Sequence, residues 1–266
     1  MFRFFTILAI SSPIDTNVNR RNEPLSRRDE GRPLWGPDGP KPEDIKKDGL
    51  EDDWFLTGAA AIANTKGSSI IQDIFTLEEK PGTEKIESVI ISLYSIKGIN
   101  TAEKDGVAPE PQKQSVKFTD VTDKFSGSND HWWIAALEYA AMQTGGDSHI
   151  KSDGFKKQGG PLEAWLMITG KHLIESKIDR KKQDWQTELW EPISKVPENY
   201  YMCIKSVSNP TDKIKDSITS DTWYAVLGHD NDEIVTLFDV KKGADFKLPF
   251  QDLKDNVGWI VIPKEN

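Results

Sequence analysis

Apolar and small residues point in almost every direction around a helix in segment 54–63, which reads Trp-Phe-Leu-Thr-Gly-Ala-Ala-Ala-Ile-Ala. A helix that is apolar all round is buried, so we predict a central core helix here. Asp52 and Asp53 stand directly before it, where acidic side chains suit the positive end of the helix dipole. Such an N-terminus can hold an anion at a cleft, but an ordinary capped core helix explains the same residues.

Two more helices are predicted before residue 198. Segment 130–142 is rich in Ala and Trp and begins at Asp130, which we expect to be its N-cap. Segment 161–169 is apolar and is followed by Gly170, a residue type that commonly closes helices. These helices and the central one make the first half of the chain mainly helical.

Strand patterns are sparse in the first half and dense in the second. Apolar and polar residues alternate in segments 84–98 and 114–123, as in strands with one face in solvent. Segment 99–113, rich in Gly, Pro, Glu and Lys, predicts a loop between them. Four further strand-like runs, separated by turn residues, occupy residues 200–207, 222–228, 233–240 and 257–263.

This order of patterns predicts an α+β protein with a mainly helical half at 33–198 and a β half at 199–266. Residues 1–32 are predicted to be a leader. Its first twelve residues resemble a minimal secretory signal, although a buried N-terminal strand explains them equally, and the rest is polar with two Arg-Arg pairs. The protein is expected to be secreted on the first interpretation and cytoplasmic on the second.

Composition excludes some partners. The 266 residues carry a formal net charge of −9, which argues against nucleic acid or an anionic membrane surface as a partner. No apolar segment reaches the roughly 20 residues that a membrane-spanning helix needs. The chain is long enough for one large domain or two small ones.

Cysteine and histidine give little support for thiol or metal chemistry. Cys203 is the only cysteine, so an intramolecular disulfide and a multi-cysteine metal site are impossible. It lies in a strand-like run rather than at a helix N-terminus, and we interpret it as a buried structural thiol. His131, His149 and His172 have no metal-like spacing, and His229 falls in a predicted hairpin turn.

Segment 44–63 resembles the nucleophile segment of the calpain cysteine proteases, which reads Asp-Ile, a Gln two residues on, then Leu-Gly-Asp-Cys-Trp and an Ala-rich helix. Asp44, Ile45, Leu50 and Asp52 match, as do Trp54 and the helix. Segments 130–142 and 159–170 resemble two further helices of this family. The resemblance implies a papain-like fold with a cleft between a helical and a β half, and calcium-dependent endopeptidase activity.

The positions that carry the family's chemistry differ in this chain. The oxyanion-hole Gln falls on Lys47 and the nucleophilic Cys on Asp53. The general-base His falls on Trp223, and the Asn that orients it falls on or next to Asp239. Asp cannot form a thioester and Trp cannot accept a proton, so we predict a pseudoprotease that binds a peptide or protein partner.

The candidate residues for contacts in the cleft are Asp52, Trp54, Trp133 and Tyr224. Asp53 and Lys47 are expected to form a salt bridge that replaces the lost catalytic pair. Two active alternatives stay open: a hydrolase that uses Asp52, Asp53 and Asp239, and a calpain-type peptidase with Cys203 as a displaced nucleophile. Calcium is implied by the family alone, since no ligand set can be matched here.

Overall fold

The computed structural model describes residues 32–47, 50–66, 69–77, 85–105, 108–121, 125, 131–146, 148–198 and 200–264. The leader predicted for residues 1–32 falls outside these residues except for Arg32, and so does the Asp130 cap. Helices and strands are both abundant, which confirms the predicted α+β class.

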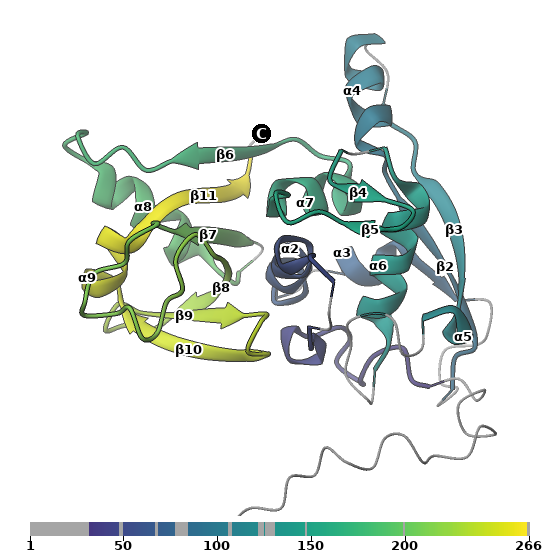
Figure 1. Cartoon of the computed structure of the whole chain (residues 1–266), viewed down its shortest axis with the longest axis horizontal. Coiled ribbons are helices and arrows are strands. Elements are labelled where there is room, and N and C mark those ends of the chain that lie inside the picture. Colours follow the sequence, from purple (N-terminus) through teal and green to yellow (C-terminus); the bar gives the residue numbers. More distant parts are fainter. Residues whose placement is uncertain are drawn as a thin grey trace, which may run out of the picture.

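Helices are concentrated before residue 198 and strands after it (Figure 1). The helical elements are η3 (Pro42–Asp44), α2 (Asp53–Ala63), α3 (Ile70–Asp73), α4 (Ile96–Asp105), α5 (Phe118–Val121), α6 (Trp133–Thr144), α7 (Pro161–Thr169), α8 (Trp185–Lys195), α9 (Phe250–Leu253) and η4 (Lys254–Asn256). The strands are β1 (Phe75–Leu77), β2 (Ser88–Leu93), β3 (Gln112–Lys117), β4 (Ile150–Lys151), β5 (Gly154–Phe155), β6 (Leu173–Lys177), β7 (Met202–Ser206), β8 (Trp223–His229), β9 (Ile234–Asp239), β10 (Ala244–Pro249) and β11 (Val257–Pro263).

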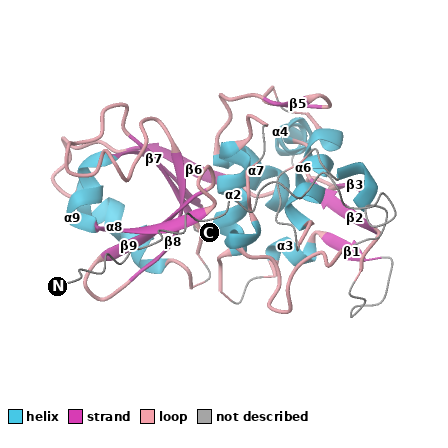
Figure 2. Ribbon diagram, turned by 60° about the horizontal axis from the view of Figure 1, so that its bottom comes forward, coloured by secondary structure: helices cyan, strands magenta, loops and turns pink. Residues whose placement is uncertain are grey.

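The largest sheet has six antiparallel strands in the order β10-β9-β8-β7-β11-β6. The central strands β7, β8 and β9 bury alternate residues on the two faces of the sheet. Different helices cover these faces, with α2 and α7 on one side and α8 and α9 on the other (Figure 2). One face packs on the central helix α2, where Cys203 and Ala225 belong to the same core as Phe55 and Ala59. The other face packs on α8 and α9, so the sheet is the middle layer of the molecule.

The central helix is buried as predicted. Every residue of α2 from Trp54 to Ile62 is buried. Helix α2 lies along β8 and β7. The Asn64 side-chain amide, just after the helix, donates to the Leu227 carbonyl (2.8 Å), and the Cys203 thiol lies 3.6 Å from the carbonyl oxygen of Thr57 in the first half of the helix. The N-terminus of α2 therefore lies near the start of β8 and the end of β9.

The large sheet includes residues from before the predicted division at 198. Strand β6 pairs with β11 at the sheet edge, and α8 contributes Leu189 and Ile193 to the core on the sheet's outer face. The first half also holds a three-stranded sheet, β1-β2-β3, on which α6 packs. It is therefore less exclusively helical than its sequence suggests, since short strands give only weak patterns.

The predicted loop at 99–113 is partly wrong, because residues up to Asp105 belong to helix α4. Ile99 and Ala102 are three residues apart and both are buried, a helical spacing that the Gly and charged residues around them obscure. The strand predicted at 84–98 is confirmed in its centre as β2, and that at 114–123 ends in the short helix α5.

Helices α2 and α7 cross at Gly58. A methyl group at Gly58 would come within 2.8 Å of the Ala164 Cβ, and the Trp165 indole donates to the Gly58 carbonyl (2.7 Å). Only glycine permits this approach, which brings α7 and the segment before it next to the N-terminal half of α2.

We predict that Gly58→Ala and Gly98→Ala have opposite effects on stability. Gly58→Ala forces the helices apart and should lower the free energy of unfolding by about 1–3 kcal/mol. Gly98 is exposed on α4, and a Cβ added there would lie 3.7 Å from its nearest neighbours, an ordinary contact distance. Gly98→Ala should therefore raise the free energy of unfolding by about 0.5–1 kcal/mol. Urea denaturation of both variants tests this, and equal effects would contradict the close crossing.

Candidate functional site

Two aspartates and two lysines meet at the N-terminus of α2. The Asp52 carbonyl accepts the first helical hydrogen bonds, from Phe55 and Leu56 (2.7 and 3.0 Å), which fixes the start of the helix. Lys47 Nζ lies 2.5 Å from Asp53 Oδ1 and 3.5 Å from Asp52 Oδ1. Lys241 Nζ lies 3.0 Å from the other oxygen of Asp53. We call Lys47, Asp52, Asp53 and Lys241 the lysine–aspartate cluster.

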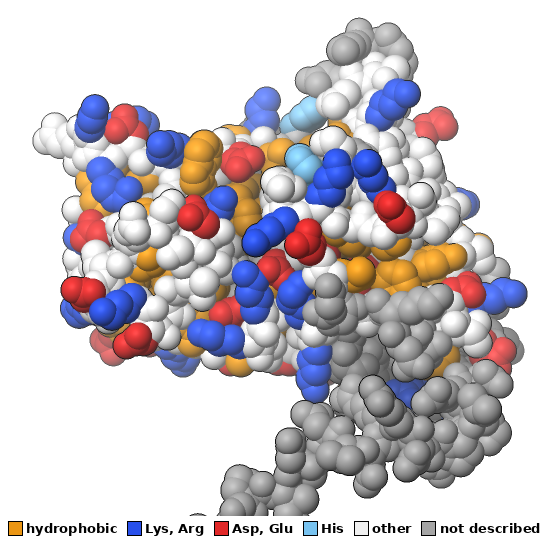
Figure 3. Space-filling model, viewed as in Figure 1, with side chains coloured by type: hydrophobic (Ala, Val, Ile, Leu, Met, Phe, Trp, Pro, Cys, Tyr) orange, Lys and Arg blue, Asp and Glu red, His pale blue; other side chains and the backbone are white. Residues whose placement is uncertain are grey.

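The cluster joins three separate parts of the chain. Lys47 precedes α2, both aspartates start the helix, and Lys241 belongs to the turn after β9. Asp52 is fully buried, whereas the side chain of Asp53 is 30% exposed. Charged side chains gather in this region, where the sheet meets the helices (Figure 3). The expected Lys47–Asp53 salt bridge is present, and Lys241 adds a partner that the sequence did not indicate.

Lys47 is held in its charged form. Burial opposes the charge and is the largest single influence, but the hydrogen bond to Asp53 and the charges of Asp52 and Asp53 together outweigh it and raise the pKa of Lys47. Its ammonium also donates to the Leu50 carbonyl. Lys47 is therefore a charged ammonium group at the position where the calpain resemblance expects a neutral amide.

Asp239 is buried and stabilises the turn that carries Lys241. One carboxylate oxygen accepts the backbone N–H of Lys241 (3.0 Å), and the other lies 3.6 Å from the Lys242 ammonium. Both contacts lie within the turn that follows β9. Asp239 therefore fixes the backbone of this turn and positions Lys241 for its ion pair with Asp53. Asp239 thus acts on the cluster through Lys241.

Trp223 lines a small pocket between the sheet and α7. This cavity of about 160 Å³ is lined by Gln158, Gly159, Gly160, Leu162, Glu163, Glu175, Lys205 and Trp223. We call it the sheet–helix pocket. A Cβ on Gly160 would stand 3.9 Å from the Trp223 ring, and the Lys205 ammonium lies 5.8 Å from the centre of that ring. An indole therefore forms the wall where the calpain resemblance expects a histidine.

Trp54 connects the cluster to this pocket. Its indole N–H donates to the Lys156 carbonyl (2.9 Å), and its ring lies so close to Gly159 that a methyl group there would come within 2.1 Å. Trp54 is 2% exposed, so it supports the pocket wall from behind and does not face a ligand.

Trp133 and Tyr224, two of the residues predicted to make cleft contacts, are both fully buried. Trp133 donates its indole N–H to Asp44 Oδ2 (2.9 Å) inside the helical half. Tyr224 neighbours Trp223 on β8 and so points to the opposite face of the sheet, where its hydroxyl accepts the Thr219 N–H (2.8 Å). Asp52 is buried as well and can act only through its charge.

Two of the histidines and the single cysteine occupy structural environments. His131 Nδ1 lies 2.6 Å from Asp44 Oδ1, and His149 Nδ1 lies 2.7 Å from Glu163 Oε1. Cys203 is fully buried on β7, and burial raises the pKa of its thiol well above the ordinary value. A protonated thiol without access to solvent cannot be a nucleophile in this conformation.

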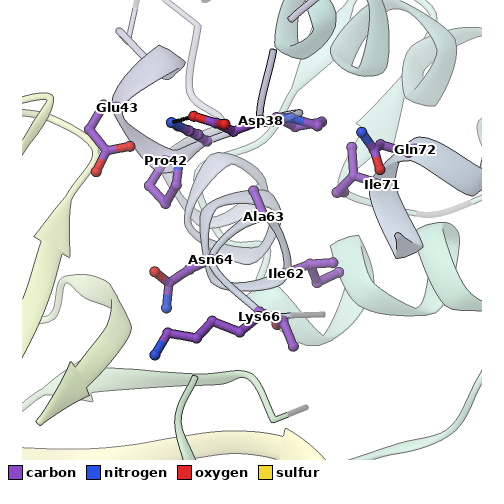
Figure 4. Close-up of a pocket in the computed structure, with 12 residues that line it drawn as sticks. Asp38, Pro42, Glu43, Ile62, Ala63, Asn64, Lys66, Ile71 and Gln72 are labelled. Carbon is purple, nitrogen blue, oxygen red and sulfur yellow. Dashed lines mark hydrogen bonds and ion pairs between the residues drawn. The ribbon is translucent and has the colours of Figure 1, made fainter. Parts of the chain in front are cut away.

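A larger cavity, of about 440 Å³, lies at the other end of α2 (Figure 4). Its lining includes the ion pair between Lys41 and Asp38 (2.6 Å) and the apolar side chains of Ile62 and Ile71. Lys66, also in the lining, lies 3.0 Å from Glu198. Two of its basic groups are thus paired with acids, and none of the candidate site residues named from the sequence lines it.

No cluster of three or more His, Cys, Asp or Glu side chains able to hold a metal ion occurs in the described parts of the chain. The acidic turn after β8 uses Asp230 internally, since its carboxylate accepts the backbone N–H groups of Asp232 and Ile234 (3.0 and 2.9 Å). None of the described helices has the length and apolar character needed to cross a bilayer.

Comparison of the sequence with models of known protein families and with characterised proteins finds no match.

We predict that Lys47→Met lowers the free energy of unfolding by about 3 kcal/mol near pH 8, because it leaves the buried Asp52 without its cation. Native Lys47 has a raised pKa, so its stabilising contribution is complete below the ordinary value of 10.5 and disappears as the pH rises through the native pKa. The difference from the natural chain should therefore shrink above about pH 10.5. Urea denaturation across this pH range measures it.

A double variant and a surface variant control this test. Adding Asp52→Asn to Lys47→Met removes the orphaned charge and should recover part of the loss. Lys41→Met removes the exposed partner of Asp38 and should leave the urea midpoint unchanged. A Lys47→Met protein as stable as the natural chain would show that the cluster is not a stabilising element.

We also predict that iodoacetamide does not modify Cys203 in the native protein near pH 8, because the thiol is buried and protonated. In 8 M urea the same thiol should react completely, which mass spectrometry of the intact chain would detect. Rapid modification under native conditions would restore the interpretation of Cys203 as a reactive nucleophile.

Proposed function

We propose that this protein is a calpain-like pseudoprotease, a papain-like scaffold without thiol catalysis that binds a peptide or protein partner where the sheet meets the helices. The observation that carries the proposal is the state of Asp53. At the position that the resemblance gives to the nucleophile, a carboxylate is bound by Lys47 at 2.5 Å and by Lys241 at 3.0 Å.

This arrangement disfavours chemistry at Asp53. The ammonium groups of Lys47 and Lys241 each bind one oxygen of the Asp53 carboxylate, which lowers the nucleophilicity of both oxygens. Trp223 has only an N–H donor, so it offers no base to activate water or a hydroxyl group. The site has the electrostatics of a salt bridge.

The position of these residues favours the papain-like interpretation over an unrelated α+β fold. A buried helix presents Asp53 to a sheet, the adjacent strand β8 begins with Trp223, and the next strand ends at Asp239 beside Lys241. This is the order in which the calpain resemblance expects nucleophile, base and orienting residue. The sheet–helix pocket, between Gly160 and Trp223, is the opening beside them.

The carboxylate hydrolase is the weaker candidate. General acid–base catalysis needs two carboxyl groups with different affinities for protons and access to a reacting group. Here Asp52 has no exposed surface, Asp53 is neutralised by two lysines, and Asp239 is committed to its own turn. No pair of aspartates is available to share the chemistry.

Fluorescein-labelled casein tests the proposal in two assays, cleavage and binding. We expect the natural chain to show no cleavage with or without calcium, and a variant with Asp53→Cys, Trp223→His and Lys47→Gln to gain slow cleavage that iodoacetamide abolishes. Cleavage by the natural chain that Asp53→Ala abolishes would replace the pseudoprotease proposal with a carboxylate enzyme.

Fluorescence anisotropy measures binding of the same casein. Gly160 has an extended backbone (φ −132°), so Gly160→Leu fits without strain and places its side chain toward Trp223. We expect this variant to weaken binding at least tenfold, while Gly98→Ala, on α4, leaves it unchanged. Equal binding by the Gly160→Leu variant and the natural chain would place the partner elsewhere.

A further inference from the structure

Four side chains form a row across the large sheet next to the sheet–helix pocket. In the strand register Lys177 of β6 pairs with Trp259 of β11, Trp259 pairs with Lys205 of β7, and Lys205 pairs with Trp223 of β8. Directly paired residues on neighbouring strands have Cβ atoms about 5 Å apart and share one face of a sheet. We call Lys177, Trp259, Lys205 and Trp223 the tryptophan–lysine row.

The row lies on the sheet face that meets α2 and α7. Two residues along each strand, the next row inward is Glu175, Val261, Cys203 and Ala225, of which the last three belong to the core shared with α2. Because side chains alternate between faces, the tryptophan–lysine row points to the same side. It continues this core outward, past the edge of the helices.

The row becomes more exposed toward the sheet edge. Trp223 is 9% exposed and lines the pocket, whereas Trp259 is 38% exposed and is one of two large exposed apolar side chains among the described residues. Apolar and basic side chains lie next to each other over β11 and β7 (Figure 3). An exposed indole between two lysines is an aromatic platform with a cation on either side.

The lysines of the row have no close ion-pair partner among the described residues. Neither Lys177 nor Lys205 forms an ion pair with a described carboxylate, although Lys205 lies over the Trp223 ring. Glu163 in the pocket is already bonded to His149 and to the Gly160 N–H. Glu175 is the other acid that lines the pocket. Burial is the largest influence on the pKa of Glu175 and raises this pKa, whereas the charge of Lys205 lowers it.

We propose that the tryptophan–lysine row is a subsite that selects an acidic side chain next to an aromatic or apolar one in the bound peptide. The ligand carboxylate pairs with Lys205 or Lys177, which flank Trp259 on its two sides, and the apolar neighbour of that acid packs on Trp259. Electrostatic complementarity of this kind gives specificity, and an exposed indole gives contact area at little entropic cost. The inference rests on the proposed function, because it names the class of peptide for that site.

An acidic peptide fits better than a nucleic acid, the other anionic ligand that stacks on tryptophan. The row offers two cations and an adjacent acid, whereas a polyanion needs an extended basic surface. The whole chain carries a net charge of −9, which repels a polyanion and is tolerable for a ligand with one or two charges.

Three synthetic peptides test the selection: acetyl-Gly-Ser-Phe-Glu-Glu-Ser-Gly-amide and its analogues with Gln-Gln or Lys-Lys in place of Glu-Glu. Calorimetric titration at 50 mM salt should give at least tenfold tighter binding of the Glu peptide than of the Lys peptide, with the Gln peptide between them. The preference should decrease at 300 mM salt, since it is electrostatic.

Variants of the protein assign the preference to the row. Lys205→Glu should weaken the Glu peptide at least tenfold and strengthen the Lys peptide. Lys205→Met keeps the aliphatic stem over Trp223, so it should fold normally and abolish the preference. Lys247→Glu is the matched control, because Lys247 is an exposed lysine on β10 at the opposite edge of the same sheet, and it should change affinity less than twofold.

The outcomes separate this inference from the proposed function. Equal affinity for the three peptides, with casein binding still weakened by Gly160→Leu, overturns the acidic selection and leaves the pseudoprotease proposal in place. A preference that is present but unaffected by Lys205→Met also overturns the assignment of the selection to the row. If neither casein nor any peptide binds, the proposed function fails and the selection falls with it.

Discussion

The structure depends on placing the start of a fully buried helix against a sheet without leaving buried carboxylates unpaired. Helix α2 has no exposed face, so Asp52 is carried into the interior with it. An unpaired buried carboxylate costs several kcal/mol, and the helix dipole alone offsets only a small part of this. Lys47, from the helical half, supplies the missing charge at 3.5 Å from Asp52 and also binds Asp53, which Lys241 binds from the sheet. The same ion pairs therefore neutralise the helix start and hold the two halves together.

Sequence patterns predicted the elements that are long or strongly apolar and missed those that depend on tertiary partners. Segment 54–63 was recognisable as a core helix because its residues are apolar in every direction, and β8 and β9 because apolar residues fill them. Helix α4 was not predicted, because in the sequence its buried side is marked only by Ile99 and Ala102. Strand β6, exposed at a sheet edge, has no apolar pattern, and only its pairing with β11 reveals it.

In the candidate site, too, the features that depend on tertiary partners were not predictable. The contact between Lys47 and Asp53 was predictable because both residues are close in sequence to the helix start. Lys241 was not, because its role depends on how the β9–β10 turn meets the helix. The burial of Trp133 and Tyr224 was not predictable, because an aromatic residue near a motif gives no information about which face it occupies. Trp223 and Tyr224 are adjacent on one strand and so lie on opposite faces of the sheet, but only the register shows which face each occupies. The register also pairs Lys205 with Trp259, from strands distant in sequence.

Catalytic groups in a cleft are commonly kept in arrangements that cost stability, such as unpaired charges and reactive side chains held near one another. Under the proposed function, each position that corresponds to a catalytic group has a residue that forms a stabilising contact. Asp53 accepts two cations, Trp223 is covered by Lys205, and Asp239 stabilises the turn that presents Lys241. These contacts form a connected set, because removing Asp239 would misplace Lys241 and removing Lys241 would leave Asp53 with one partner. This rigidity suits the proposed binding function, since a pocket wall that is already ordered loses little entropy when a peptide binds.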